Sequence, residues 1–434
     1  MAADIATESF EQGDKVTLRV LVDKQKSKVV YAEAGKDFVD ALFSFLTLPL
    51  GTIARLVAKE SDIEAVIFGS INSLYQSVTD LDQQYLFNQT CKEMLLTPRN
   101  FMESLIQHMK LNIDNTPVQY FACEDWQFCR GDISGTRVTT FRNQKCICGK
   151  RLNAPSLFHV VPITDVNGFF KDTATFLIRD DFCVMPDDLE TSLFLLKKQG
   201  FSDFANVEKK TLHITKNEVV DLLKLSLLSK TPMTDFIFKN GKFAKPNSTF
   251  QSEIRIGKDL PSDQGNHMVV KVLRRKSNRK ILFATSEEDF ADFLFSFLTF
   301  PLGGVLQILE GLSSISSIDV LYTSMTELSS DQFLRSKVLK DELADPRIFP
   351  GFKLKNQILP IGTRELTSKL VNDDLVVTPM SSIDAVSYLE RMKVPLNDVE
   401  EIVVSIGVKE GLSILKSSLT STSALTNGLN QYIG

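Results

Sequence analysis

The N-terminal part of the chain shows two patterns of hydrophobic positions in succession. Residues 16–23, VTLRVLVD, alternate apolar and polar side chains, and this period of two predicts a strand. A polar turn and a second apolar stretch at residues 28–34 complete the pattern of a β-hairpin. Over residues 37–48 the spacing becomes helical, and Pro49 ends this helix because it lacks an N–H and disfavours helical backbone at the preceding residue.

Later stretches predict further elements of both kinds. A second helix is expected at residues 52–60. Two strands and two helices are then expected around Phe182–Met185, Leu189–Lys198, Thr211–Ile214 and Glu218–Leu228. Helices and strands in this mixture, opening with a hairpin, predict an α+β fold.

The pattern around the first helix occurs twice. FSFLTLPLG at residues 43–51 returns as FSFLTFPLG at residues 295–303, with one substitution. The similarity extends to the preceding hairpin and to later blocks in the same order, including LYQSVTDL with LYTSMTEL and DDFCVMP with DDLVVTP. The sequence therefore predicts two tandem repeats, each opening with a β-hairpin followed by a buried helix.

Changes in the offset between matching blocks define the expected boundaries. Arg99 and Asp180 lie 81 positions apart, whereas the matching Arg347 and Asp373 lie 26 apart, so the first repeat holds 55 extra residues. We expect a first repeat over residues 1–238 with an insertion at about 105–175, a linker at 239–266 and a second repeat at 267–434. The linker is rich in Pro, Gly, Ser and Asn.

A narrow polar stripe runs along the predicted first helix of each repeat. Its positions are spaced i, i+4 and i+7, which places them on one face of a helix that is otherwise apolar. The six residues are Asp40, Ser44, Thr47, Asp292, Ser296 and Thr299. Either the stripe is the hydrated or back-bonded edge of a core helix, or the two stripes face each other or a shared ligand across a pseudo-twofold interface.

Four of the six cysteines fall in the insertion, as two close pairs: Cys123, Cys129, Cys146 and Cys148. Four thiolates suit a structural zinc ion, and short-range pairs lower the loop entropy of assembling the ligands. Gly149 permits the tight turn of a metal knuckle. Because neither pair has C-x2-C spacing, free cysteines and a disulfide or redox pair stay open beside a zinc-ribbon-like insertion.

Basic residues surround these cysteines, with Trp126 and Phe128 between the first pair. They are Arg130, Arg137, Arg142, Lys145, Lys150 and Arg151. Basic hairpins that carry aromatic residues can bind nucleic acid through phosphate contacts and base stacking. A solvated surface is the commoner role of such residues, so nucleic acid is not the expected partner.

Composition and charge indicate which class of protein this chain belongs to. With 434 residues, 43% hydrophobic and 24% charged, the chain is expected to be a globular protein of two or three domains. A net charge of −5 gives no general basic field for nucleic acid or an anionic membrane. Residues 1–15 lack the pattern of a secretory signal, so a cytoplasmic or nuclear location is expected. Residues 293–309 carry no charge, but Pro301 breaks them, which favours buried helix over a membrane span.

Sequence signatures of common enzymes are missing. The chain has no G-x-G-x-x-G, P-loop, H-E-x-x-H or G-x-S-x-G motif. The acidic pairs Asp180-Asp181 and Asp373-Asp374 could suggest acid–base catalysis. Neighbouring residues of a strand point in opposite directions, so a turn or a partner for a helix N-terminus is the favoured interpretation.

Several stretches together resemble a plant family catalogued as a domain of unknown function, number 674. They are LVDKQKSKVVYAEAGKDFVDALFSFLTLPLGTI, GSINSLYQSV, FLIRDDFCVMP and the cysteine pattern that ends in CICG. The resemblance implies a plant origin, tandem repeats and no established activity. The second repeat reads RRKSNRKILFATSEEDF and lacks the cysteine segment, so any function of that segment belongs to the first repeat.

We therefore expect a non-catalytic interaction or scaffold protein with a structural zinc site and an unidentified protein partner. The alternatives are a small ligand or catalysis in a cleft between the repeats, and recognition of nucleic acid by the zinc hairpin.

Overall fold

The computed structural model contains both helices and strands, in agreement with the α+β prediction. The residues that it describes are 15–59, 63–86, 89–114, 116, 120–125, 129, 138–139, 142, 144–146, 148–155, 168–201, 204–239, 267–286, 288–344, 369–379 and 381–433. The predicted linker, apart from Lys239, lies outside these residues, as does much of the predicted insertion.

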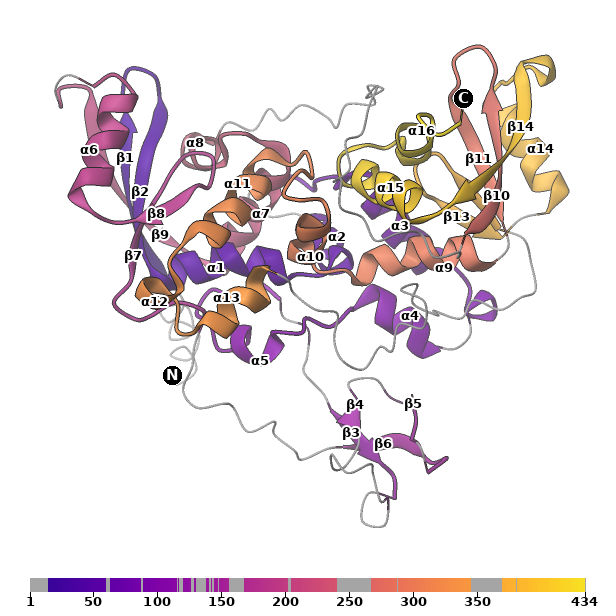
Figure 1. The fold of residues 1–434 in the computed structure, drawn as a ribbon, viewed down its shortest axis with the longest axis horizontal. Helices are drawn as coiled ribbons and strands as arrows, with labels where there is room; N and C mark the ends of the chain where they lie inside the picture. Colours follow the sequence, from indigo (N-terminus) through magenta and orange to yellow (C-terminus); the bar gives the residue numbers. More distant parts are fainter. Residues whose placement is uncertain are drawn as a thin grey trace, which may run out of the picture.

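Two five-stranded antiparallel sheets stand at opposite ends of the molecule (Figure 1). The first has the order β8-β7-β2-β1-β9 and is built from β1 (Val16–Asp23), β2 (Lys28–Gly35), β7 (Thr175–Ile178), β8 (Val184–Pro186) and β9 (Val207–Ile214). The second has the order β13-β12-β11-β10-β14 and is built from β10 (Met268–Arg275), β11 (Ile281–Ser286), β12 (Lys369–Asn372), β13 (Val377–Pro379) and β14 (Val399–Ile406).

The predicted hairpin is present as β1 and β2, and its inward side chains belong to the core. β9 begins four residues earlier than predicted, and β7 was missed. The stretch TFLI of β7 is a short apolar run without alternation, and such a run does not distinguish a strand from a buried helix.

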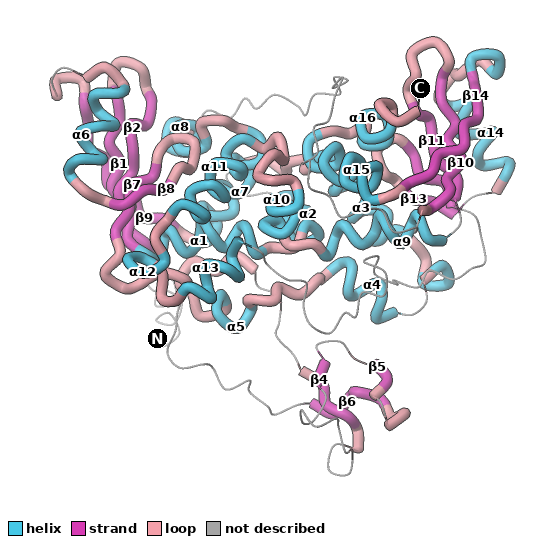
Figure 2. Tube along the Cα trace, in the orientation of Figure 1, coloured by secondary structure: helices cyan, strands magenta, loops and turns pink. Residues whose placement is uncertain are grey.

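Most helices lie between the two sheets, whereas α6 (Leu189–Lys198) and α14 (Ser382–Arg391) lie on the outer sides of the first and second sheet (Figure 2). From the first part of the chain come α1 (Lys36–Thr47), α2 (Leu50–Val57), α3 (Gly69–Asp80), α4 (Gln89–Leu96), α5 (Glu103–Ile106), α6 (Leu189–Lys198), α7 (Lys216–Leu228) and α8 (Pro232–Phe238). From the second come α9 (Glu288–Ser296), the 3-10 turn η2 (Phe297–Thr299), α10 (Leu302–Ile308), α11 (Ser316–Glu327), α12 (Ser330–Phe333), α13 (Lys337–Ala344), α14 (Ser382–Arg391), α15 (Val408–Thr420) and α16 (Ala424–Leu429). Two further 3-10 turns are η1 (Gln83–Tyr85) and η4 (Leu396–Asp398).

Each five-stranded sheet and the helices that pack on it form one lobe of the molecule. Each lobe includes helices from the other part of the chain. α3 packs against α15, α9 and β13, although it follows the first hairpin in sequence. Reciprocally, α11 packs against α7 and β8 (Figure 1). One large hydrophobic core therefore runs through both lobes rather than two separate cores.

The two nonapeptides meet at the centre of this arrangement. Pro49 and Pro301 form an isolated antiparallel bridge. The N–H of Leu50 donates to the carbonyl of Phe300 at 2.9 Å, and the N–H of Leu302 donates to the carbonyl of Leu48 at the same distance. The repeated motif thus pairs with itself, since each proline ends a helix and leaves extended backbone free to bond to the other copy.

The uncharged residues 293–309 are divided among α9, η2 and α10, and Phe295, Phe297 and Leu302 in this stretch are buried. No helix in the described part of the chain has the length and apolar character needed to cross a membrane.

Phe45 and Phe297 are the matching aromatic residues of the two nonapeptides, and both are fully buried. We expect Phe45→Ala and Phe297→Ala each to lower the free energy of unfolding by about 3–5 kcal/mol, because each leaves a cavity in the core. Chemical denaturation measures this loss. Phe194→Ala, at an exposed position of α6, is the control and should cost less than about 1 kcal/mol. Near-neutral effects at Phe45 and Phe297 would contradict their place in the core.

Candidate functional site

A small third sheet carries the four clustered cysteines and lies below the two lobes (Figure 1). Its strand order is β4-β3-β6-β5, with β3 (Phe121–Cys123), β4 (Val138–Thr139), β5 (Gln144–Lys145) and β6 (Arg151–Pro155). The Thr90 hydroxyl of α4 donates to the carbonyl of Arg142 at 3.1 Å, which links this ribbon to the first lobe's helices.

Two tight turns present the cysteines. Cys123 ends β3, and the N–H of Cys129 donates to the carbonyl of Asp125 at 2.7 Å. Between β5 and β6, the N–H of Gly149 donates to the carbonyl of Cys146 at 2.9 Å. Gly149 has a φ of 83°, a left-handed conformation that favours glycine, as the sequence predicted for a metal knuckle.

The four sulfur atoms of Cys123, Cys129, Cys146 and Cys148 lie within 4.8 Å of one another. The Sγ atoms of Cys123 and Cys148 are 3.4 Å apart, and so are those of Cys129 and Cys146. Zinc–sulfur bonds of about 2.3 Å in a tetrahedron place sulfur atoms about 3.8 Å apart. The cluster therefore has the donor set and the size to hold a metal ion.

Proximity also changes the acidity of the thiols. Hydrogen bonds to the Cys146 and Cys148 sulfurs raise the pKa of Cys129 to about 12. Burial acts to raise the pKa of Cys146, but hydrogen bonds from the Cys148 N–H and the neighbouring thiols outweigh it and lower this pKa to about 7. Hydrogen bonding in the cluster thus favours ionisation of the Cys146 thiol and disfavours that of Cys129. A cation in their midst would allow all four to ionise, because metal binding releases the protons.

The ribbon has very little hydrophobic core of its own. In the described residues, the buried members of its cluster are Cys123, Cys146 and Leu152, with Cys129 packed against them. A segment of this size rarely folds on such a core without a metal or disulfides. In the described part of the ribbon, the sulfur cluster therefore adds to the burial of Phe121 and Ala122 of β3 as a source of stability.

The basic residues around the cysteines are only partly described. Arg142, Lys145, Lys150 and Arg151 are exposed, and Arg142 lies over the Phe121 ring at 5.0 Å. Arg130 and Arg137, like Trp126 and Phe128, lie outside the described residues.

The hydroxyl groups of the predicted polar stripes donate within their own helices, and the Thr47 hydroxyl also accepts from the side-chain amide of Asn100 at 2.9 Å. Ser44 donates to the carbonyl of Ala41 at 2.7 Å and Thr47 to that of Ser44 at 2.8 Å. In the second half, Ser296 donates to Phe293 at 2.6 Å and Thr299 to Ser296 at 2.8 Å. This is the back-bonded arrangement that allows a polar residue on a buried helix. Asp292 is buried beside them.

Asp40 has a different role, because it anchors the chain that returns from the insertion. Its Oδ1 accepts the N–H of Phe169 at 2.7 Å and that of Phe170 at 3.2 Å. Gly168 has a φ of 82°, and a side chain there would overlap the Asp40 carboxylate. Burial raises the pKa of Asp40 to about 6, against the opposing effects of Lys36 and these two amides.

A cavity of about 440 Å³ opens beside this anchor. Lys36, Asp40 and Lys110 line it from the first half of the chain and Arg335 from the second. The charged groups pair with one another. Lys36 Nζ lies 3.4 Å from Asp40 Oδ2, Lys110 Nζ lies 2.7 Å from Asp37, and an Arg335 nitrogen lies 2.8 Å from Asp172. The cavity is thus polar and internally neutralised.

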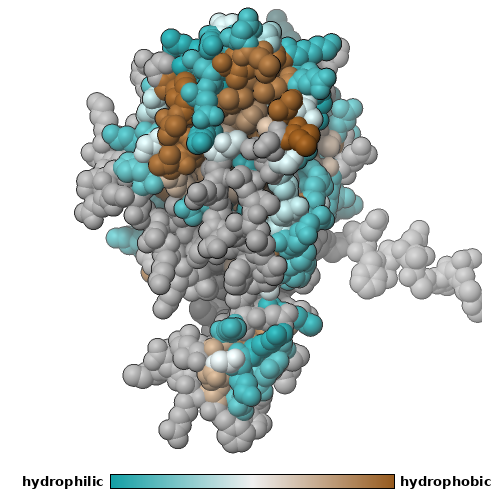
Figure 3. All heavy atoms as spheres, turned by 90° about the vertical axis from the view of Figure 1, so that its right-hand side faces the viewer, coloured by the Kyte–Doolittle hydropathy of each residue, from teal (hydrophilic) through white to brown (hydrophobic). Residues whose placement is uncertain are grey.

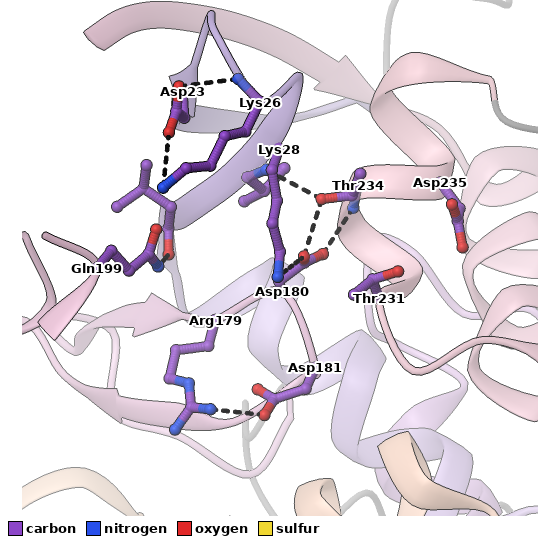
Figure 4. Close-up of polar contacts among 12 residues, drawn as sticks. Asp23, Lys26, Lys28, Arg179, Asp180, Asp181, Gln199, Thr231, Thr234 and Asp235 are labelled. Atoms are coloured by element: carbon purple, nitrogen blue, oxygen red, sulfur yellow. Dashed lines mark hydrogen bonds and ion pairs between the residues drawn. The ribbon is translucent and has the colours of Figure 1, made fainter. Parts of the chain in front are cut away.

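The first aspartate of each acidic pair lies at a helix N-terminus, which is one of the two placements that the sequence favoured. Asp180 accepts both the N–H and the hydroxyl of Thr234 at 2.8 Å, in the first turn of α8 (Figure 4). Asp373 accepts the N–H of Thr426 in α16 at 2.8 Å. Carboxylates are stabilised at helix N-termini.

A family model described as "Protein of unknown function (DUF674)" matches residues 12–370 and 363–409 of the chain. The chain belongs to the DUF674 family. The resemblance to this family drawn from the sequence is thereby confirmed, and the match includes the ribbon cysteines and all strands of both large sheets. No curated protein and no solved structure matches the DUF674 protein.

Sequence reasoning found the four cysteines of this DUF674 protein but missed the partners of Asp40. Phe169 and Phe170 bind through backbone N–H groups, which any residue but proline offers, so no side-chain pattern marks them. Gly168 was the one available signal, and a lone glycine in a polar stretch is too common to identify an anchor.

Asp40→Asn tests the electrostatic role of this anchor. The pKa of Asp40 is about 6 in the folded protein against an ordinary value of 3.8, so its contribution to stability is greatest below about pH 4 and declines as the pH rises towards 6. The decline amounts to about 3 kcal/mol. Asparagine keeps the acceptor for both amides without the charge. We therefore expect D40N to be at least as stable as the wild type at pH 7 and to lose this part of the pH dependence.

Urea denaturation from pH 4 to 7 measures both effects. Asp80→Asn, which removes an exposed carboxylate at the end of α3, controls for the loss of one negative charge. A D40N profile parallel to that of the wild type would show that Asp40 does not titrate in this way.

Proposed function

We propose that the DUF674 protein is a non-catalytic scaffold made of two duplicated α+β units, with a structural zinc ribbon inserted into the first. The observation that carries the metal part of this proposal is the convergence of four cysteine sulfurs within 4.8 Å. The scaffold part rests on how the two units share their helices.

Matching hydrogen bonds in the two lobes support duplication. In the first, the N–H of Val184 donates to the hydroxyl of Ser324 at 3.0 Å. In the second, the N–H of Val377 donates to the hydroxyl of Ser77 at the same distance. Both bonds join a sheet to a helix from the other part of the chain. A duplicated unit whose helices exchange partners accounts for this reciprocity.

A second matching pair lies at the hairpins. The N–H of Val29 donates to the Thr234 hydroxyl at 2.9 Å, and the N–H of Ile281 donates to the Thr426 hydroxyl at 2.9 Å. Both threonines also bond to the aspartates that begin the acidic pairs. Because the two lobes exchange helices and share one core, the molecule is suited to presenting surfaces at its two ends.

Zinc is the metal we propose for the ribbon. Four thiolates form a soft donor set that suits a tetrahedral ion, and a site with four protein ligands leaves no position for water, so the role is structural. A non-catalytic role is also supported by the polar stripes, whose hydroxyls donate within their own helices.

Metal analysis of the purified protein tests this proposal. We expect about one zinc per chain in protein prepared under reducing conditions without chelator. Cys146→Ser should lose the metal and expose the ribbon to proteolysis, because the bound ion supplies on the order of 10 kcal/mol to such a small module.

Cys91→Ser is the matched control, since Cys91 lies in α4 and is not a member of the cluster. It should keep the metal. A wild-type chain without metal, or a C146S variant with unchanged metal content, would remove the zinc ribbon from this account.

The cavity beside Asp40 supports a second candidate, a small polar ligand held between the two units. Its volume of about 440 Å³ is in the range of ligand sites, and residues from both halves line it. The candidate ranks second because the charges around the cavity already pair with one another. A saturable thermal shift with a polar metabolite, reduced in Lys110→Ala at the exposed rim, is the expected result if this candidate is right. Equal shifts in wild type and K110A would place the ligand elsewhere.

A further inference from the structure

β9 and β14 are edge strands at matching positions of the two large sheets. They differ in how their free edges are protected from pairing with another strand. Each is antiparallel to the first strand of its sheet and stands at the sheet's end. In the described part of the chain, no further strand pairs with the free edge of either one. An open edge of eight residues presents backbone N–H and C=O groups to any approaching strand.

On the inner face, the difference concerns one pair of residues. Lys210 of β9 lies opposite Val20, and Ile402 of β14 lies opposite Val272. Directly opposed residues share a face of the sheet, so Lys210 is a charge turned towards the core side, where its ammonium group lies over the Phe238 ring. An inward lysine is a common protection of an edge strand. β14 has the half-buried Ile402 in its place.

On the outer face, the contrast is similar. Thr211 of β9 lies opposite Arg19, whereas Val403 of β14 lies opposite Lys271 and is 60% exposed. Val269 on the neighbouring strand is 67% exposed. At these two matched positions, β14 therefore offers an apolar side chain on both faces of its free edge, whereas β9 has Lys210 and Thr211 there.

Other apolar side chains are exposed in the same lobe. They are Ile383 and Val386 of α14 and Leu396 of η4. Figure 3 views the molecule from this end and shows hydrophobic residues gathered over its upper part. An exposed, apolar strand edge within such surroundings marks a site of strand addition.

We propose that β14 pairs antiparallel with β14 of a second copy of this chain, which joins two five-stranded sheets into one continuous sheet. Around a twofold axis at Val403, that residue faces its own counterpart on the outer face. On the inner face Ile402 faces Val404, and on the outer face Glu401 faces Ser405. No like charges oppose each other, so the strand is complementary to itself.

The other exposed edge of matching length fits β14 less well. Pairing β14 with β9 of another copy would bring the inward Lys210 against the apolar inner face of the added strand. It would also be a head-to-tail contact, which forms open filaments rather than closed dimers. A strand-to-strand contact of this kind is small, so the dimer belongs to the weak, concentration-dependent class. This inference depends on neither the zinc ribbon nor duplication.

Paired glutamate substitutions provide the test. Val403→Glu lands opposite Lys271, and the control Thr211→Glu lands opposite Arg19, so a cation compensates each new charge within its own sheet. Only V403E brings like charges together across the proposed interface, because the new carboxylate meets its own counterpart and Glu401 of the second copy. Analytical ultracentrifugation of the full chain over a wide concentration range measures self-association, and hydrogen exchange reports protection of residues 399–406.

We expect the wild type to form a dimer reversibly, with protection of residues 399–406 that increases with concentration. V403E should weaken the dimer by at least about 10-fold, and T211E should behave as the wild type. A wild type that stays monomeric up to its solubility limit overturns the proposal. So does a dimer that V403E leaves unchanged.

Discussion

The backbone of Leu48–Leu50 pairs with that of Phe300–Leu302 across the middle of the molecule, and the arrangement of the helices depends on this pairing. Each proline ends one helix and begins the next, so the chain leaves its own sheet at that point and continues into the other lobe. α3 and α11 then cover the sheet of the opposite half. Two backbone hydrogen bonds of 2.9 Å thus fix the point at which the chain crosses, and burial of the hydrophobic side chains around them makes the arrangement cooperative.

The ribbon follows a different physical rule from the lobes. The lobes are stabilised by a large shared hydrophobic core, whereas the buried cluster of the ribbon consists mainly of cysteines. Metal binding would supply the stabilising free energy that apolar burial supplies in the lobes, since the free energy of binding is also free energy of folding. The ribbon also interrupts the first half between α5 and β7, and Asp40 holds the chain where it returns. The insertion is thereby attached without disturbing the sheet that it interrupts.

The two sheet ends differ although their strand orders match. Lys210 and Thr211 stand at one edge where Ile402 and Val403 stand at the other. Neither pair changes the fold, because an edge residue contacts one neighbouring strand only. Such positions are free to acquire an interaction role while the core stays constant. A protein of this design would use one end for self-association and keep the other end protected.

The sequence by itself determined the mixed fold, the hairpin, the positions of α1, α2, α6 and α7, and the four-cysteine cluster. Alternation, helical spacing and cysteine spacing are local signals, and local geometry follows from them directly. Only the tertiary structure decided that FSFLTLPLG bonds to FSFLTFPLG, that α3 and α11 exchange sheets, and that Asp40 binds the N–H groups of Phe169 and Phe170. These contacts join segments more than a hundred residues apart through backbone groups common to nearly all residues. A one-dimensional pattern carries no record of such pairings, because their free energy arises only when the whole core assembles.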